Sequence, residues 1–366
     1  MNSDLFRSPW TGIAVLAAVA AFPLVAGGED LPFVVSVLIE VFIFAVFAMS
    51  FNLLVGYTGY VSFGHALFLG AGAYGTALLV ANAGFTFLVA AVLSLTLTAI
   101  LAVVVALVSF RRSGVYFAIV TLAFAQIAYT LFRRWDYVGG VTGVTIPPPT
   151  VLGYEFNPFE PLGYYYFCLG SVVVIYLFVR SLVRSPFGHV LLAIRENEER
   201  ARAIGYDVWK FKLAAFTLSG TLGGVAGVLY AAYFTQVAPG STLYWTVTGD
   251  GLFMILIGGI GTLVGPLIGA AFVVGVRYSL STHLAEAIPA AAPELVHRLP
   301  ERWPLLLGLI FMATVLYFPQ GIAGGLGFSR TRSIEGALPM PGERTDESPG
   351  DGGKLEPSPD SEGGGR

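Results

Sequence analysis

The chain has 366 residues, of which 55% are hydrophobic and 12% are charged, and its formal net charge is −3. Soluble domains carry about twice this share of charged residues, so the composition excludes a purely soluble protein and indicates one embedded in lipid. The charge provides no basic surface for nucleic acid. A single cysteine, Cys168, excludes an intrachain disulfide and a cysteine metal cluster.

The first apolar run, residues 10–27, has the character of either a cleaved signal peptide or a retained membrane span. Arg7 is the only basic residue before it, and no clear A-x-A cleavage site precedes Glu29. Because several further apolar runs follow, we expect this first run to be retained as a span.

Apolar runs of the length that crosses a bilayer recur along the chain. A membrane helix needs about 20 mostly apolar residues, and these runs predict an all-α, polytopic transmembrane helix bundle of about 8–10 spans. The number depends on whether the run 252–276 is broken. The predicted spans are 10–27, 31–55, 63–83, 85–109, 115–132, 164–179, 211–234, 252–276 and 304–318.

The distribution of Lys and Arg predicts the orientation of the bundle. Arg111 and Arg112 flank one short loop, and seven Lys or Arg residues lie between 180 and 212. Two predicted spans separate these loops, so both fall on the same side, which the positive-inside rule makes cytoplasmic. Counting spans backwards places the N-terminus there too. Arg133 and Arg134 are an exception at the outer end of a span.

Glycine is concentrated in three clusters inside the apolar runs. Small residues allow membrane helices to approach closely, so the clusters predict tight helix packing. The alternative is helices broken around a transport path, which Pro266 favours in the third cluster. Similar small-residue runs at 70–73 and 269–271 raise the hypothesis of an inverted repeat. The clusters are Gly56, Gly59, Gly64, Gly70, Gly72 and Gly75; Gly220, Gly223, Gly224 and Gly227; and Gly258, Gly259, Gly261, Gly265 and Gly269.

Polar side chains interrupt the apolar runs at Glu40, Asn52, Ser62, His65 and Gln126. Such groups are costly in lipid and must face protein or water. They lie either on a substrate path or in hydrogen bonds between helices, and the residues alone leave both interpretations open. No carboxylate pair or Asp/His chain marks a proton relay, which argues against an ion-coupled carrier.

Two longer connections are expected between spans. Residues 135–161 contain Gly139, Gly140 and three consecutive prolines at 147–149, which cannot continue a helix. Residues 279–303 mix charged residues with prolines, and we expect short interfacial helices there.

The segment 185–212 is the most specific feature of the sequence. Residues 190–204 lack helix breakers and predict an exposed helix, which Gly205 ends. Three i,i+4 pairs would support it, namely Arg195–Glu199, Glu196–Arg200 and Glu198–Arg202.

This predicted helix also has a small apolar stripe, formed by Ala193, Ala201 and Ile204. A charged helix with such a stripe between two spans is either a docking element for another protein or a solvated loop helix. The residues themselves favour neither interpretation.

The same segment resembles the cytoplasmic loop of branched-chain amino acid ABC permeases of the LivM type. The matching residues are Gly188, Ala193 to Glu198 (AIRENE), Ala201, Gly205, Lys212, Ala215 and Phe216. Stretches within 52–65, 114–122 and 258–266 are similar to the same family, and the resemblance covers about residues 31–325. One departure is Tyr60, where the family often has Gln, which puts a substrate contact at this position in doubt.

The resemblance implies an ABC importer permease in the plasma membrane. An extracellular solute-binding protein would deliver the amino acid, a second permease subunit, identical or not, would complete the pathway, and two ATP-binding cassette ATPase subunits would supply energy. Coupling to the ATPases is expected at Gly188, Arg195, Glu196, Asn197, Glu199 and Gly205. Candidates for the translocation pathway are Asn52, Ser62, His65, Tyr116, Thr121 and Gln126.

The chain has no phosphate-binding loop, because Lys210, Lys212 and Lys354 are its only lysines and none completes G-x-x-x-x-G-K-[ST]. We expect no catalytic residue, metal or cofactor, and an energy source on another chain. Two alternatives stay open: an ABC permease for another small solute, such as a sugar or urea, and an ion-coupled secondary transporter.

The predicted organisation has three parts. Residues 1–30 hold the N-terminal segment and first span, and residues 31–328 form the permease domain with a coupling loop at about 185–210. Residues 329–366 are rich in Gly, Pro, Ser, Asp and Glu, a composition that predicts a disordered acidic tail.

Overall fold

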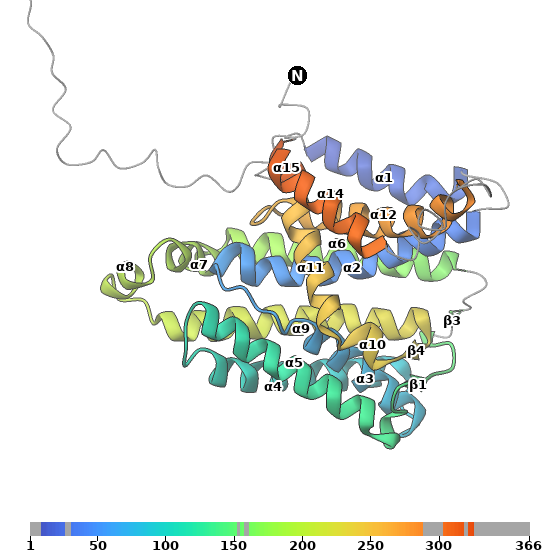
Figure 1. Cartoon of the computed structure of the whole chain (residues 1–366), viewed down its shortest axis with the longest axis horizontal. Helices are drawn as coiled ribbons and strands as arrows, with labels where there is room; N and C mark the ends of the chain where they lie inside the picture. The colour runs from blue at the N-terminus through green and yellow to red at the C-terminus, as the bar shows by residue number, and fades with distance from the viewer. Residues whose placement is uncertain are drawn as a thin grey trace, which may run out of the picture. The chain divides into compact units, whose positions relative to one another are not determined.

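The computed structural model describes residues 9–25, 31–151, 154–156, 161–287, 303–317 and 321–325. They form a bundle of helices with a few very short strands (Figure 1). The predicted tail from residue 329 lies outside the described residues. The helices are α1 (Pro9–Val25), α2 (Leu31–Thr58), α3 (Ala66–Ala81), α4 (Phe87–Ser109), α5 (Val115–Arg134), η1 (Asp136–Val138), α6 (Leu162–Arg184), α7 (Pro186–Glu196), α8 (Glu198–Ala203), α9 (Val208–Phe234), α10 (Pro239–Thr242), α11 (Trp245–Gly258), α12 (Gly265–Ala287), α14 (Trp303–Tyr317) and α15 (Gly321–Gly325).

Five helices in the described part of the chain are long and apolar enough to cross a membrane: α2, α4, α5, α6 and α9. Helices α1 and α3 are apolar but shorter. The prediction of a polytopic, all-α membrane protein is therefore confirmed.

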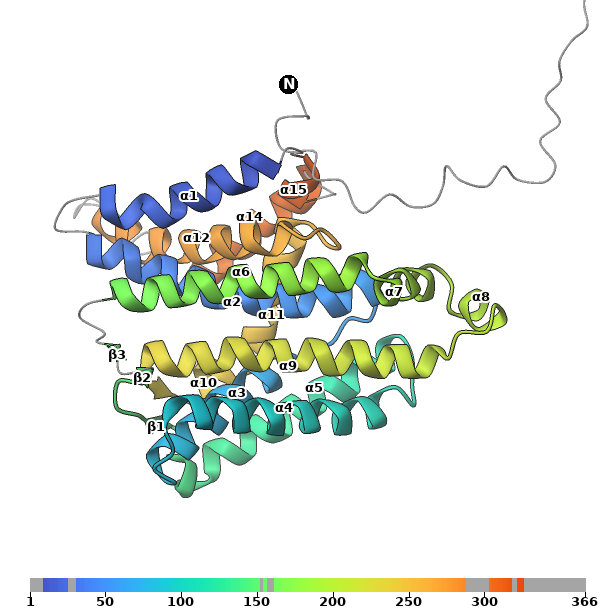
Figure 2. The same cartoon turned by 180° about the vertical axis from the view of Figure 1, so that it is seen from behind.

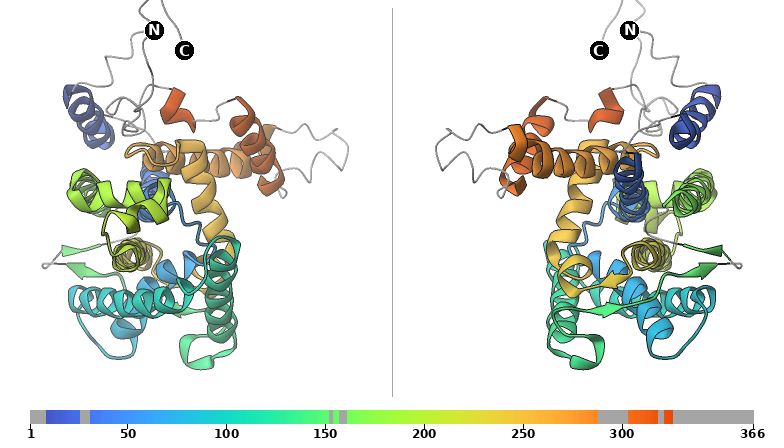
Figure 3. Two further views of the ribbon diagram at one scale, coloured as in Figure 1. Left: turned by 90° about the vertical axis from the view of Figure 1, so that its left-hand side faces the viewer. Right: turned by 90° about the vertical axis from the view of Figure 1, so that its right-hand side faces the viewer.

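The predicted run 252–276 is broken into two helices. Helix α11 has 14 residues, which extend about 21 Å, less than the roughly 30 Å of a hydrocarbon core. It crosses the bundle steeply relative to α2 and α9 and ends at the break 259–264, after which α12 begins (Figures 1 and 3). The predicted connection 279–303 begins later than expected, because α12 continues to Ala287; residues 288–302 lie outside the described residues.

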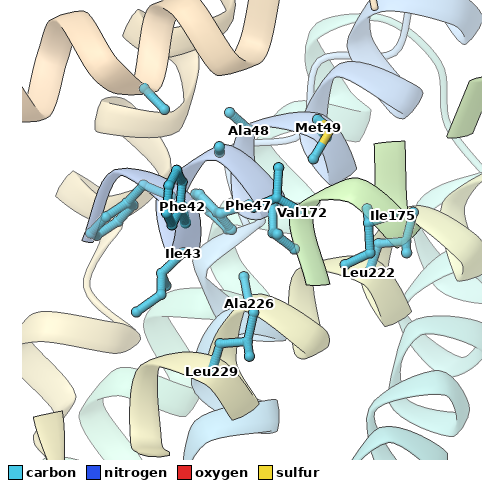
Figure 4. Close-up of a cluster of buried hydrophobic side chains, with 14 of the residues drawn as sticks. Phe42, Ile43, Phe47, Ala48, Met49, Val172, Ile175, Leu222, Ala226 and Leu229 are labelled. Carbon is cyan, nitrogen blue, oxygen red and sulfur yellow. The ribbon is translucent and has the colours of Figure 1, made fainter. Parts of the chain in front are cut away.

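Helix α2 lies in the interior of the bundle. Nearly all residues of α2 from Ile39 onward are buried, which suits a helix that is apolar on every side. Helices α6 and α9 flank it, and Figure 4 shows Phe42 and Phe47 of α2 with Val172 of α6 and Leu229 of α9 in this core. Since lipid tails are as apolar as these side chains, the packing gains its energy from close van der Waals contact.

The glycine clusters confirm the prediction of tight packing. A Cβ atom on Gly72 of α3 would overlap the backbone of Gly224 in α9, and one on Gly227 would overlap the carbonyl oxygen of Leu69. In the third cluster, Gly269 of α12 packs equally closely against Met254 of α11. Close packing and a broken helix therefore occur together in that cluster.

Two non-helical segments connect helices of the bundle, residues 59–65 between α2 and α3, of which Ser62, Gly64 and His65 are buried, and residues 259–264 between α11 and α12. We call 59–65 the unwound segment and 259–264 the α11–α12 break. Both contain glycine at positive φ, 78° at Gly59 and 75° at Gly261. The first and third glycine clusters thus share a helix–break–helix form, while the inverted repeat stays a hypothesis.

The two ends of the bundle differ in structure. Helices α7 and α8 and the turn between α4 and α5 lie at one end, so the two basic loops share a side as predicted (Figures 1 and 2). At the other end, β1 (Val144–Thr145) pairs with β4 (Gln236–Val237), and β2 (Thr150–Val151) pairs with β3 (Tyr154–Glu155), both antiparallel. Strands β1, β2 and β3 lie in the predicted non-helical connection 135–161, and β4 follows α9.

Candidate functional site

The predicted single helix 190–204 is wrong, because the structure divides it at Asn197. Helix α7 begins with Pro186 in its first turn, ends at Glu196, and is followed by the six-residue α8. Asn197 has extended backbone angles, φ −159° and ψ 105°, and its side chain accepts a hydrogen bond from the backbone N of Arg200 at 2.8 Å. Asparagine is a favoured N-cap residue, and it starts a new helix here.

The two glycines predicted in this segment have separate structural roles. Gly188 packs so closely that a Cβ atom would overlap the backbone of Val183. Gly205 has φ 97° and follows the end of α8, as predicted from its position. We call residues 186–203, which form α7 and α8, the coupling segment.

The buried residues Val190, Ile194 and Ala201 of the coupling segment cluster with Val208 of α9, and Phe211 packs against them. Of the predicted stripe, Ala201 is buried, whereas Ile204 follows the end of α8 and its side chain is 67% exposed. Because Asn197 divides the segment, Ala193 lies on α7 and Ala201 on α8. A shallow hollow beside α7 is lined by Arg184, Pro186, His189, Val190, Ala193, Ile204 and Tyr206.

Arg195 links the coupling segment to the unwound segment and to the α11–α12 break. Its Nη1 donates a hydrogen bond to the carbonyl oxygen of Gly56, in the last turn of α2. The last four carbonyl groups of a helix lack partners within it, so a cation is well placed here. A Cβ atom on Gly59 would lie 3.1 Å from Arg195 Cγ, and one on Gly261 would lie 3.2 Å from Nη1.

Asn52 of α2 holds the α11–α12 break beside Arg195. Its Oδ1 accepts from Gly261 N at 2.9 Å, and its Nδ2 donates to the Thr262 carbonyl oxygen at 2.8 Å. Thr262 Oγ1 in turn accepts from Gly265 N at 3.0 Å. The non-helical backbone is therefore satisfied by protein groups, as burial away from water requires.

The outer surface of the coupling segment carries charge. Glu196, Asn197 and Glu199 are exposed, as is Gly205 after α8. Of the three predicted i,i+4 pairs, Glu198–Arg202 forms an ion pair at 3.0 Å. Arg195 and Glu199 lie on different helices because of the division at Asn197. Near the start of α9, Asp207 pairs with Lys210 at 2.9 Å, which lowers the pKa of the aspartate.

A second link between the coupling segment and the bundle involves Tyr60, Glu198 and Lys212. Lys212 Nζ donates to Glu198 Oε2 at 2.5 Å and to the Tyr60 hydroxyl, and that hydroxyl donates to Glu198 Oε2 at 2.9 Å. Partial burial raises the pKa of Glu198, but hydrogen bonds from Lys212 and Tyr60 and nearby positive charge outweigh it, so the pKa is below its ordinary value. This link was not predicted, because its members are far apart in sequence.

Four of the pathway candidates are buried within the chain. Thr121 Oγ1 of α5 accepts from Phe63 N at 3.2 Å, and Ser62 Oγ accepts from Gly64 N at 3.3 Å. His65 Nε2 lies 3.1 Å from Ser50 Oγ. These three residues, with Asn52, hold the unwound segment and the α11–α12 break.

The other two pathway candidates, Tyr116 and Gln126, are exposed on α5. The six candidates therefore form two groups, four inside the chain and two on its surface. Their assignment to a translocation pathway stays a prediction.

Glu40 is only 4% exposed and is engaged between helices. Arg277 of α12 pairs with its Oε1, and the hydroxyl of Tyr278 donates to its Oε2 at 2.7 Å. The interpretation of Glu40 as part of an interhelical contact is therefore confirmed. Arg277 was missed because the predicted span ended at residue 276, one position before it.

The sequence profile described as "Branched-chain amino acid transport system / permease component" matches residues 33–316. The chain belongs to this family. It is therefore a membrane-embedded permease component of an ABC-type transport system, and its relatives are transport subunits rather than enzymes. In the described residues, no group of three or more His, Cys, Asp or Glu residues could hold a metal ion.

The relatives of this chain have several transport roles. It is 28% identical to "High-affinity branched-chain amino acid transport system permease protein LivM" of Salmonella typhimurium, across 85% of this chain and 73% of the relative. It is 33% identical to "Probable branched-chain amino acid transport permease protein LivH" of Methanocaldococcus jannaschii, across 39% and 42%. "Autoinducer 2 import system permease protein LsrC" of Klebsiella pneumoniae is 29% identical, across 37% of each chain. No solved structure matches the chain significantly.

Proposed function

We propose that this protein is the permease subunit of an ATP-driven importer of branched-chain amino acids in the plasma membrane. Two separate ATPase subunits would bind the coupling segment, and an extracellular solute-binding protein would deliver the substrate to the opposite end. The observation that carries the proposal is the position of Arg195. It extends from the exposed coupling segment to the end of α2 and to the α11–α12 break, so a force on α7 reaches both.

A second permease subunit would cover one face of α5. This α5 face comprises Tyr116, Ala123, Gln126, Thr130 and Arg134, and Gln126 lies in a shallow hollow on it. Exposed polar groups at membrane depth are unfavourable against lipid.

Helix α4 provides the contrast. Its large exposed side chains are apolar, including Val92, Leu97 and Ile100, as suits a lipid-facing helix. We therefore assign the α5 face to the pathway between two permease subunits. The similarity to both LivM and LivH supports a partner from the same family.

Uptake by the assembled complex tests this function. The chain would be co-expressed with a second permease, the ATPases and the binding protein, and reconstituted in liposomes. We expect ATP-dependent uptake of labelled leucine, and none in liposomes that hold this chain alone. Uptake by this chain alone, driven by an ion gradient, would instead establish a secondary transporter.

The similarity to LsrC, a permease for autoinducer 2 import, supports a different solute as the second candidate. Competition by unlabelled ribose, urea or autoinducer 2 separates these substrates. If one of them is transported in place of leucine, the ATP-driven permease assignment stands and the substrate assignment fails.

A further inference from the structure

Tyr60, Glu198 and Lys212 meet at the junction of three parts of the chain. Glu198 belongs to α8, Lys212 to α9 and Tyr60 to the unwound segment. The ammonium group of Lys212 also lies 4.5 Å from the ring centre of Tyr60, a cation–π distance. The Tyr60 ring packs edge-on against Phe117 at 5.2 Å and Phe110 at 5.3 Å, and so reaches the turn between α4 and α5.

The charged members of this cluster depend strongly on one another. Lys212 is 7% exposed, and its charge is neutralised by Glu198. Removing Glu198, whose side chain is 32% exposed, would leave the charge of the buried Lys212 without its partner, which is more costly than removing both charges. A displacement of Glu198 therefore draws Lys212 and the Tyr60 hydroxyl with it.

Helix α8 depends on such contacts for its position. It has six residues, too few for a stable isolated helix. Its inner side is held by Ala201 and Glu198, whereas Glu199, Arg200 and Arg202 are exposed. A protein that binds the exposed side would move α8 against the bundle mainly through Glu198.

Side-chain hydrogen bonds also hold the unwound segment, in place of the continuous backbone hydrogen bonds of a helix. Thr121 accepts from Phe63 N, and Thr248 Oγ1 of α11 accepts from Ala66 N at 2.9 Å, at the start of α3. A shift at Tyr60 therefore reaches α5, α11 and α3 through backbone groups a few residues away.

We propose that Tyr60, Glu198 and Lys212 form a joint that transmits movement of α8 to the unwound segment and hence to α3. This inference rests on the proposed function and adds a second route beside Arg195, which acts on α2 and the α11–α12 break and lies against Gly59, the neighbour of Tyr60. It also gives a role to Tyr60. The hydroxyl of Tyr60 faces the coupling segment, so its role is positioning rather than contact with substrate.

The substitution Tyr60→Phe tests the joint, because it removes the hydroxyl and retains the ring that packs against Phe110 and Phe117. Tyr57→Phe is the matched control, since the buried Tyr57 hydroxyl has no hydrogen-bond partner among the described residues. The readouts are the amount of assembled complex and the number of leucine molecules imported per ATP hydrolysed. We expect Tyr60→Phe to assemble normally but import about tenfold less leucine per ATP, the effect of losing one hydrogen bond to a charged group. Tyr57→Phe should match the wild type.

A double-mutant cycle with Glu198→Gln covers the case in which Tyr60→Phe assembles poorly. If the joint is one unit, the double variant loses no more coupling than the more affected single variant. Additive losses, or a wild-type ratio in Tyr60→Phe while the wild type imports leucine, overturn the joint alone. A wild-type complex that imports none of leucine, ribose, urea and autoinducer 2 overturns the proposed function and the joint together.

Discussion

Arg195 contacts three separate parts of the candidate site. Its guanidinium group serves the carbonyl end of α2 and lies beside Gly261, while its aliphatic stem lies beside Gly59, and both glycines have positive φ. Any side chain at these two positions would strain the backbone and crowd the arginine. The local sequence explains why Arg195 belongs to the coupling segment, but not what it contacts.

Replacing Arg195 by Ala should loosen both breaks. A hydrogen bond to a charged group contributes about 1.5–3 kcal/mol, so local opening should become at least about tenfold more frequent. Hydrogen exchange of peptides covering 56–63 and 259–264 would measure this. Arg200→Ala is the control, because its exposed side chain forms no ion pair in the described structure. Equal exchange in the two variants would contradict the linking role of Arg195.

Helix pairs α3–α9 and α11–α12 show how elements are held together where the hydrophobic effect between helices is weak. Glycines remove the side chain at the crossing, so backbone meets backbone. Ser94 of α4 adds a hydrogen bond to the Gly72 carbonyl oxygen at 2.9 Å, beside the crossing of α3 and α9. The packing role of these glycines followed from the sequence, but their partners did not.

The substitution Gly72→Leu should destabilise the bundle by about 3 kcal/mol or more, because its side chain would enter the backbone of α9. Gly170→Leu on α6 is the control, as nothing lies within 4 Å of a Cβ atom there. The thermal unfolding midpoint of the detergent-purified protein should fall for the first variant and stay close to wild type for the second. Equal midpoints would rule out close packing at Gly72.

At the scale of the whole molecule, the exposed faces of α4 and α5 differ in polarity. Helix α4 exposes apolar side chains, whereas α5 combines exposed apolar residues with Gln126 and Arg134. A single chain with such a face is incomplete in a membrane, which agrees with the proposed second permease subunit.

Cysteine crosslinking in the co-expressed complex should distinguish the two faces. In a Cys168→Ala background, Gln126→Cys should form a crosslink to the second permease subunit, whereas Leu97→Cys on α4 should not. Mass spectrometry of the crosslinked species identifies the partner. Crosslinking at Leu97 and its absence at Gln126 would reverse the assignment of the faces.

Composition, the lengths of the apolar runs and the positions of Lys and Arg determined the membrane class, most helix positions and the shared side of the two basic loops, because hydrophobicity and charge act over short stretches of chain. The resemblance of local motifs to known permeases indicated the family. Tertiary structure decided the rest. It placed Arg195 beside the unwound segment and the α11–α12 break, divided the coupling segment at Asn197 and joined Tyr60 to Glu198 and Lys212. These features depend on which distant backbone groups lack partners after packing, and a linear pattern does not contain that information.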